Sequence, residues 1–184
     1  MRNTGIRLFS SPSLNGIVPT QVRFSPDGQV VTYLANPPED RERLDLYAYE
    51  LATGTSNRLI DASRIHATGE LTAAEKAERE RRRQFSAGLS SYRWLPDGRR
   101  ICGMLDGAVY VFDRETESLR PITGEGLRQT DLTVSPGGRY LSYVRAGDLY
   151  LYDLVLAREE RLTCDASDCV TNGLAEFVDR KSVV

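Results

Sequence analysis

The chain has 184 residues, of which 40% are hydrophobic and 27% are charged, so it can bury an ordinary core and is not of disordered composition. The formal net charge of −2 argues against a general nucleic-acid binder, which would be basic. No apolar run approaches the roughly 18 residues that a membrane-spanning helix needs, and the first residues lack the apolar stretch of a signal peptide. The compartment, cytoplasmic or periplasmic, stays undetermined, because the authentic start of the chain can lie further upstream.

Three segments, beginning at Val22, Tyr92 and Leu132, share one order of features. Each reads as an apolar strand, a turn of the form [SL]-P-[DG]-G, a second apolar strand, a third strand such as "DLYLYD", and a short closing strand. Proline presets φ and glycine supplies a positive φ in such turns, and apolar residues at every second position suit a strand buried on one face. Four strands per repeat predict the blades of a β-propeller, and a β-sandwich with similar hairpins is the alternative.

The spacing of the turns predicts an insertion. Pro96 and Pro136 lie 40 residues apart, which is a usual blade length, whereas Pro26 and Pro96 lie 70 apart. The first connection between blades therefore carries an insert of about 30 residues, roughly 61–90. We expect an all-β fold: a partial β-propeller of about three four-stranded blades and the start of a fourth, with one inserted α-helix.

The predicted helix is "LTAAEKAERERRRQF", residues 71–85. Thr72 precedes Glu75 by three residues, which is a capping signal, and Glu75 precedes Arg79 by four, which is the favourable order for an ion pair. The thin apolar face excludes a core helix, so a solvated, ion-paired surface helix is one interpretation. The arginines at 81–83 also offer forked donors that can hold a carbonyl or a carboxylate.

The chain shows no catalytic constellation of its own. His66 is the only histidine, and no G-x-S-x-G stretch occurs. Cys164 and Cys169 are close enough in sequence for a small disulfide loop, but their spacing matches no metal pattern and reduced thiols are favoured over pairing. We expect no catalytic residue, no metal site and no cofactor in these residues.

The stretches "SPDGQVVTYL", "LTAAEKAERERRRQ", "GLSSYRWLPDG" and "VTNGLAEFV" resemble, in the family's order, the N-terminal propeller of the dipeptidyl peptidase IV family, bacterial members included. The resemblance covers about residues 6–178. It implies an eight-bladed propeller joined to a C-terminal α/β-hydrolase domain of a serine peptidase, which removes X-Pro or X-Ala dipeptides from peptide N-termini. The expected role is substrate gating and binding, with a homodimer implied for the full-length protein. A stand-alone propeller-like binding or scaffold module is the alternative.

The resemblance also assigns residues. In the family, the last arginine of an R-E-R-x-R helix contacts the backbone carbonyl of the bound N-terminal residue. The stretch "RERRR" places that role on Arg83, with Arg79 as the weaker candidate. The family's amine-binding glutamate pair would follow Val178 after two residues, where Lys181 and Ser182 stand. The catalytic serine, aspartate and histidine have no counterpart here, so the chain itself is not expected to be catalytic.

Residues 179–184, "DRKSVV", follow the point where the resemblance stops. The string GAT CGG AAG AGC GTC GTG encodes this hexapeptide and resembles a sequencing-library adapter whose next codon is a stop. We therefore interpret 1–178 as propeller sequence and 179–184 as a non-native tail, with the hydrolase domain absent. Amplification of the locus from source DNA tests this, since an in-frame "DRKSVV" followed by a stop in the native gene would contradict it.

Overall fold

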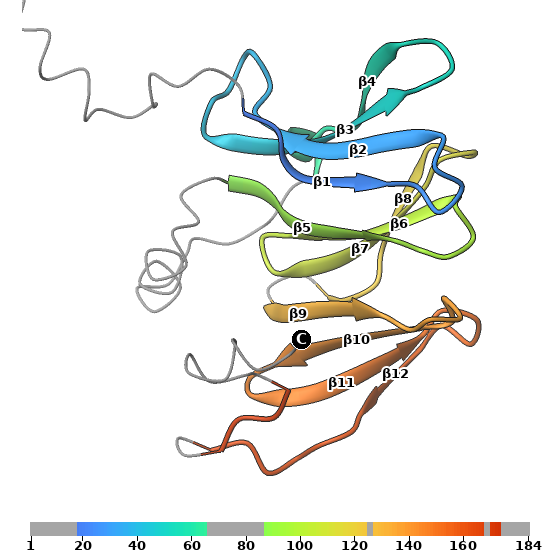
Figure 1. Cartoon of the computed structure of the whole chain (residues 1–184). Helices are drawn as coiled ribbons and strands as arrows, with labels where there is room; N and C mark the ends of the chain where they lie inside the picture. Colours follow the sequence, from blue (N-terminus) through green and yellow to red (C-terminus); the bar gives the residue numbers. More distant parts are fainter. Residues whose placement is uncertain (1–17, 66–86, 125–126, 168–169, 174–184) are drawn as a thin grey trace, which may run out of the picture. The chain divides into compact units, whose positions relative to one another are not determined.

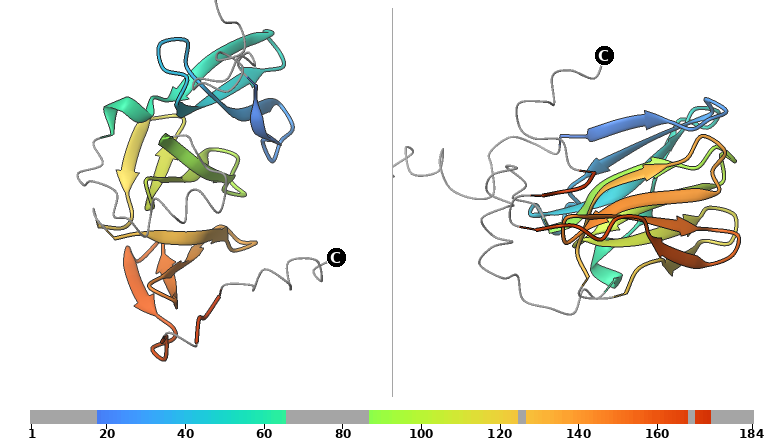
Figure 2. Two further views of the ribbon diagram at one scale, coloured as in Figure 1. Left: turned by 90° about the vertical axis from the view of Figure 1, so that its left-hand side faces the viewer. Right: turned by 90° about the horizontal axis from the view of Figure 1, so that it is seen from below.

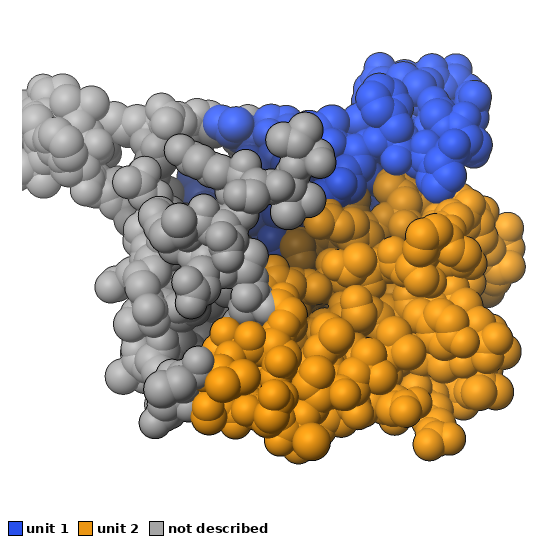
Figure 3. Space-filling view, turned by 60° about the horizontal axis from the view of Figure 1, so that its bottom comes forward, with its two compact units in different colours: residues 1–90 blue, residues 91–184 orange. Residues whose placement is uncertain are grey.

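The structure is a computed structural model that describes residues 18–65, 87–124, 127–167 and 170–173 (Figure 1). These residues form twelve β-strands and one short 3₁₀ turn. The chain divides into two units, 1–90 and 91–184, shown in different colours in Figure 3. Among the described residues, no helix has the length and apolarity to cross a membrane.

The first unit contains an antiparallel meander of four strands, which we call blade 1, followed by the 3₁₀ turn η2. Its elements are β1 (Thr20–Phe24), β2 (Val30–Ala35), β3 (Arg43–Glu50), β4 (Thr55–Ile60) and η2 (Ala62–Arg64). Each strand pairs with the next in sequence. The start of β3 also pairs in parallel with the start of β5, Leu44 opposite Gly88.

Two further meanders follow, which we call blade 2 and blade 3. Blade 2 consists of β5 (Ala87–Trp94), which begins in the first unit, β6 (Arg100–Leu105), β7 (Ala108–Asp113) and β8 (Ser118–Pro121). Blade 3 consists of β9 (Gln129–Val134), β10 (Tyr140–Arg145), β11 (Asp148–Asp153) and β12 (Arg158–Arg161). Neighbouring strands within each blade are hydrogen-bonded in chain order. The predicted all-β fold with four-stranded repeats is therefore confirmed.

The Pro-Asp-Gly turns fold as their residues predict. In blade 1 the amide of Ser25 donates to the carbonyl of Val30 at 2.8 Å, and the amide of Gly28 donates to the carbonyl of Ser25 at 2.9 Å. Gly28 has a φ of 71°, a conformation that residues with a Cβ rarely adopt. The first of these bonds recurs as Leu95 to Arg100 at 2.8 Å and as Ser135 to Tyr140 at 2.9 Å. One local sequence signal thus sets the first hairpin of all three blades.

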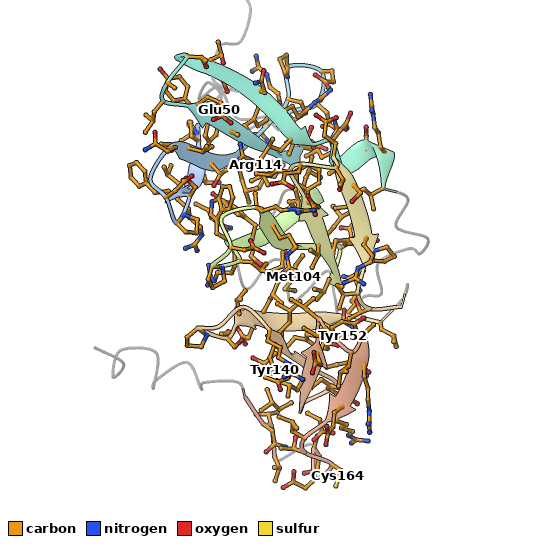
Figure 4. All side chains as sticks on the ribbon, turned by 90° about the vertical axis from the view of Figure 1, so that its right-hand side faces the viewer. Glu50, Met104, Arg114, Tyr140, Tyr152 and Cys164 are labelled. Carbon is orange, nitrogen blue, oxygen red and sulfur yellow. The ribbon has the colours of Figure 1, made fainter. Side chains whose placement is uncertain are left out.

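Blades 2 and 3, whose strands are drawn in Figure 2, supply the residues of one hydrophobic core. Met104 of β6 and Tyr152 of β11, both labelled in Figure 4, belong to this core. The remaining members are Leu95, Cys102, Val109, Val111, Leu132, Leu141, Tyr143 and Leu154. Apolar residues at every second position supply one face of each strand, and burying these faces against each other stabilises the pair of blades.

A fourth repeat begins in the described residues. The amide of Gln129, where β9 starts, donates to the carbonyl of Gly107 at 2.8 Å. The amide of Asn172 donates in the same way to the carbonyl of Gly147, at 2.7 Å. Because Gly107 and Gly147 occupy equivalent turns, Asn172 stands where the first strand of the next blade would start.

Some sequence predictions fall on residues that are not described. The helix predicted over 71–85 lies outside the described residues, and so do Arg79, Arg83 and the tail at 179–184. Cys169 also lies outside them, whereas Cys164 is an exposed free thiol. The assignments of domains and site residues that rest on these segments remain predictions.

Candidate functional site

The predicted substrate-binding arginines, Arg79 and Arg83, lie between η2 and β5. Both ends of this connection are described, the first at Ile65 and the second at Ala87. Each end is held by the first residues of β3, one through side chains and the other through the backbone. These two attachments position the connection at blade 1.

The first attachment is made by Asp45, whose side chain is completely buried. Its Oδ1 atom accepts a hydrogen bond from the amide of Ala62 at 3.0 Å, which ties η2 to β3. Asp61 caps the same turn, because its Oδ1 accepts from the amide of Ser63 at 3.0 Å. Ordinary N-capping and one buried carboxylate thus fix the direction in which the chain leaves blade 1.

Two arginines surround the Asp45 carboxylate. Arg43 donates through Nε to Asp45 Oδ1 at 3.0 Å, and Arg58 lies 3.2 Å from Asp45 Oδ2. Arg58 also contacts Glu39 at 2.6 Å and Asp61 at 3.3 Å. We call these five residues the Asp45 network. A buried carboxylate is tolerated only when such donors satisfy it, so the network keeps charged groups at this end of blade 1 in one arrangement.

The charges in the network stabilise one another. The hydrogen bond from Arg58 lowers the pKa of Glu39, and the hydrogen bond from Ser63 lowers the pKa of Asp61. The hydrogen bond to Asp45 raises the pKa of Arg43. All three shifts favour the ionised forms, so the network holds its charges at neutral pH.

The second attachment depends on Gly88. Its φ is +90°, and a Cβ there would lie 2.5 Å from the carbonyl oxygen of Leu44 and 2.9 Å from Cγ of Arg43. No side chain fits such a gap, so glycine is required for β5 to approach β3 this closely. The described residues on either side of 66–86 are therefore both held at residues 43–45.

Blade 3 contains an aspartate–arginine pair equivalent to that of Asp45 and Arg58 in blade 1. In blade 3, Asp148 takes the place of Asp45 and forms an ion pair with Arg161, which takes the place of Arg58. Asp148 Oδ1 also accepts from Thr163 Oγ1 at 3.0 Å and from Asn172 Nδ2 at 3.2 Å. The carboxylate again holds the start of the connection to the next blade.

Blade 2 lacks both partners of this ion pair. Ala108 stands at the position of the aspartate and Pro121 at the position of the arginine. Its connection to β9, 122–128, is far shorter than the connection after blade 1, 61–86. The aspartate–arginine pair thus accompanies the longer connections, where additional side-chain contacts hold the start of the connection against the blade.

Sequence reasoning missed the residues that hold the insert. The signal was present, because Asp45 and Arg58 align with Asp148 and Arg161 when the three repeats are written in register. Gly88, only a few residues before the second apolar repeat, was a second signal. These residues are polar or small and lie within strands. Apolar periodicity, which predicts the strands, depends only on the apolar positions and so does not mark them.

Residues 99–182 match the protein family described as "Dipeptidyl peptidase IV (DPP IV) N-terminal region". The match covers 84 of the 184 residues, the C-terminal part of the chain. The predicted resemblance to the dipeptidyl peptidase IV N-terminal region is therefore confirmed, and the matched residues include most of blade 2 and all of blade 3.

Two solved structures are similar to this chain. Dipeptidyl peptidase 4 from Porphyromonas gingivalis matches with a TM-score of 0.49 and 20% identity, covering 78% of this chain and 19% of that one. TolB from Acinetobacter baumannii matches with a TM-score of 0.52 and 20% identity, covering 84% of this chain and 34% of that one. At this identity the likeness to TolB shows the fold alone. The chain spans about a fifth of the first protein and a third of the second.

Proposed function

We propose that this chain is the propeller portion of a serine dipeptidyl peptidase that gates and binds peptide substrates. The observation that carries the proposal is the family match over residues 99–182. The attachments at Asp45 and Gly88 support it, because they hold the described residues on both sides of 66–86 at the same part of β3. The substrates are peptides with Pro or Ala as the second residue, from which X-Pro or X-Ala is released.

In this proposal Arg83 holds the backbone carbonyl of the substrate's N-terminal residue. A guanidinium presents several N–H donors in a fixed plane, so it orients a carbonyl oxygen as well as attracting it. One such charge-assisted hydrogen bond contributes roughly 1.5–3 kcal/mol. Arg79 is the weaker candidate for the same contact. Bond cleavage would be carried out by a hydrolase domain elsewhere in the longer protein.

The substitution Arg83→Ala in the protein encoded by the complete gene tests this role. A loss of 1.5–3 kcal/mol corresponds to a reduction of about tenfold or more in kcat/KM for Ala-Pro or Gly-Pro substrates. Arg82→Ala is the matched control, since it removes the same charge from the neighbouring position and should retain activity. Unchanged kinetics for Arg83→Ala would refute the assignment.

The complete gene also tests the class of protein. A downstream reading frame with a nucleophile elbow of the G-W-S-Y-G-G type supports a peptidase, because the elbow presents the serine of an α/β-hydrolase. A complete gene without such a frame would identify a stand-alone propeller-like module instead.

A further inference from the structure

Blade 1 differs from the other two blades in the turn between its second and third strands. In blades 2 and 3 this turn has two residues, 106–107 and 146–147, all with positive φ as in a tight hairpin turn. In blade 1 it is a loop of seven residues, 36–42. A blade of this repeat therefore folds without such a loop, and loops on a rigid scaffold carry a disproportionate share of binding residues.

The loop 36–42 is held in one defined shape. Asn36 Nδ2 donates to the carbonyl of Arg43 at 2.8 Å, which closes the loop at its base. Within the loop, the amide of Asp40 donates to the carbonyl of Pro37 at 3.1 Å, and the amide of Glu42 donates to Asp40 Oδ1 at 2.9 Å. Pro37 is buried, and its ring fixes φ. The side chains of the loop are therefore presented from a fixed backbone.

Two carboxylates of the loop are already paired. Glu39 lies 2.6 Å from Nη1 of Arg58, and Asp40 lies 3.4 Å from Nη1 of Arg43. Arg41 differs from these two arginines, because it is exposed and forms no hydrogen bond or ion pair with any described residue. Its guanidinium donors are therefore available to a ligand.

The loop lies beside the candidate site. Arg43, directly after the loop, pairs with Ala87, where β5 begins. Asp45, two residues further on, holds the turn η2 that precedes 66–86. The loop and the described residues on both sides of 66–86 thus meet at the start of β3 (Figure 1). Arg41 precedes Arg43 by two residues, and two residues of chain span at most about 7 Å.

We propose that Arg41 binds an acidic side chain of the first residue of the substrate, so that the peptidase prefers peptides that begin with Asp-Pro or Glu-Pro. The inference rests on the proposed function, in which Arg83 holds the backbone carbonyl of that same residue. A guanidinium and a carboxylate form two parallel hydrogen bonds, which select for charge and for shape. Because the loop already has one shape, this contact requires no ordering of its backbone.

Kinetics of the protein encoded by the complete gene test the proposal, with Glu-Pro, Gln-Pro and Lys-Pro substrates. Gln-Pro has nearly the shape of Glu-Pro without its charge. The wild type should favour Glu-Pro over Gln-Pro in kcat/KM by about threefold to fivefold, the range of a good exposed ion pair. Arg41→Ala should bring this ratio close to one, with Gln-Pro cleavage unchanged. Arg41→Glu should reverse the preference in favour of Lys-Pro.

A matched control separates this contact from the effect of net charge. Arg158→Glu makes the same charge change at an exposed position of β12 in blade 3 and should leave the three substrates in their wild-type order. A wild-type ratio of Glu-Pro to Gln-Pro near one, or a ratio that Arg41→Glu leaves unchanged, would overturn the role of Arg41 while the proposed function stands. Failure to cleave any of the X-Pro substrates would overturn the proposed function and this inference with it.

Discussion

Replacing Asp45 with alanine tests the most heavily buried charge in blade 1. The substitution leaves the amide of Ala62 without its acceptor, which costs about 1–3 kcal/mol when such a donor is buried. It also removes the carboxylate between Arg43 and Arg58, and breaking a buried pair costs about 3–5 kcal/mol. Arg43 keeps other carboxylates within 3.6 Å and Arg58 keeps one at 2.6 Å, so the cost falls at the lower end. We expect a loss of about 3 kcal/mol in the free energy of unfolding.

Urea unfolding of the 184-residue chain, followed by circular dichroism, measures this loss. With an m value of about 1–3 kcal/mol/M, a loss of 3 kcal/mol lowers the midpoint by about 1 M or more. Glu39→Ala removes an exposed carboxylate that also pairs with Arg58, and it should leave the midpoint nearly unchanged. Asp148→Ala, the equivalent change in blade 3, should lower it. A midpoint for Asp45→Ala equal to that of Glu39→Ala would refute the view that the buried carboxylate holds the chain.

Three further predictions concern backbone, thiols and pH. Gly88→Ala should lower the urea midpoint strongly because its Cβ would overlap the backbone of β3, whereas Gly137→Ala, with open space around it, should not. In the native chain an alkylating reagent should modify the exposed Cys164 and spare the buried Cys102, whose pKa burial raises to about 12; equal rates measured by mass spectrometry would contradict this. The hydrogen bond from Arg99 lowers the pKa of Asp113 to about 2. The contribution of this ion pair to stability is therefore complete above about pH 4 and is lost as the pH falls toward 2. Asp113→Asn should therefore flatten the acid side of the stability profile, and an unchanged profile would count against that ion pair.

The repeated blades were predictable because their signals are local. Pro26 and Gly28 set the first hairpin of blade 1 within a few residues, and the alternation in "DLYLYD" fixes which side chains of β11 share a face. Such features need no knowledge of the rest of the chain. The prediction of an insert has a similar local basis, since the distance between Pro26 and Pro96 exceeds one blade length.

The attachments of the insert were not predictable in the same way. The Asp45 network joins β3 to residues 58, 61 and 62, and no short motif marks this meeting. The requirement for glycine at Gly88 arises only because β5 approaches the backbone of β3. Contacts of this kind are set by the order of strands in the sheet, which periodicity within one strand does not contain.

By itself, the sequence determined the blades, their turns and the resemblance to the dipeptidyl peptidase IV N-terminal region. The tertiary structure alone decided which apolar strand faces are buried. Phe24 and Val134 occupy equivalent positions in equivalent strands, yet Phe24 is 65% exposed while Val134 packs against the core. Alternation along a strand creates an apolar face, but burial of that face depends on the strands that pack against it, and only the folded arrangement shows which strands those are.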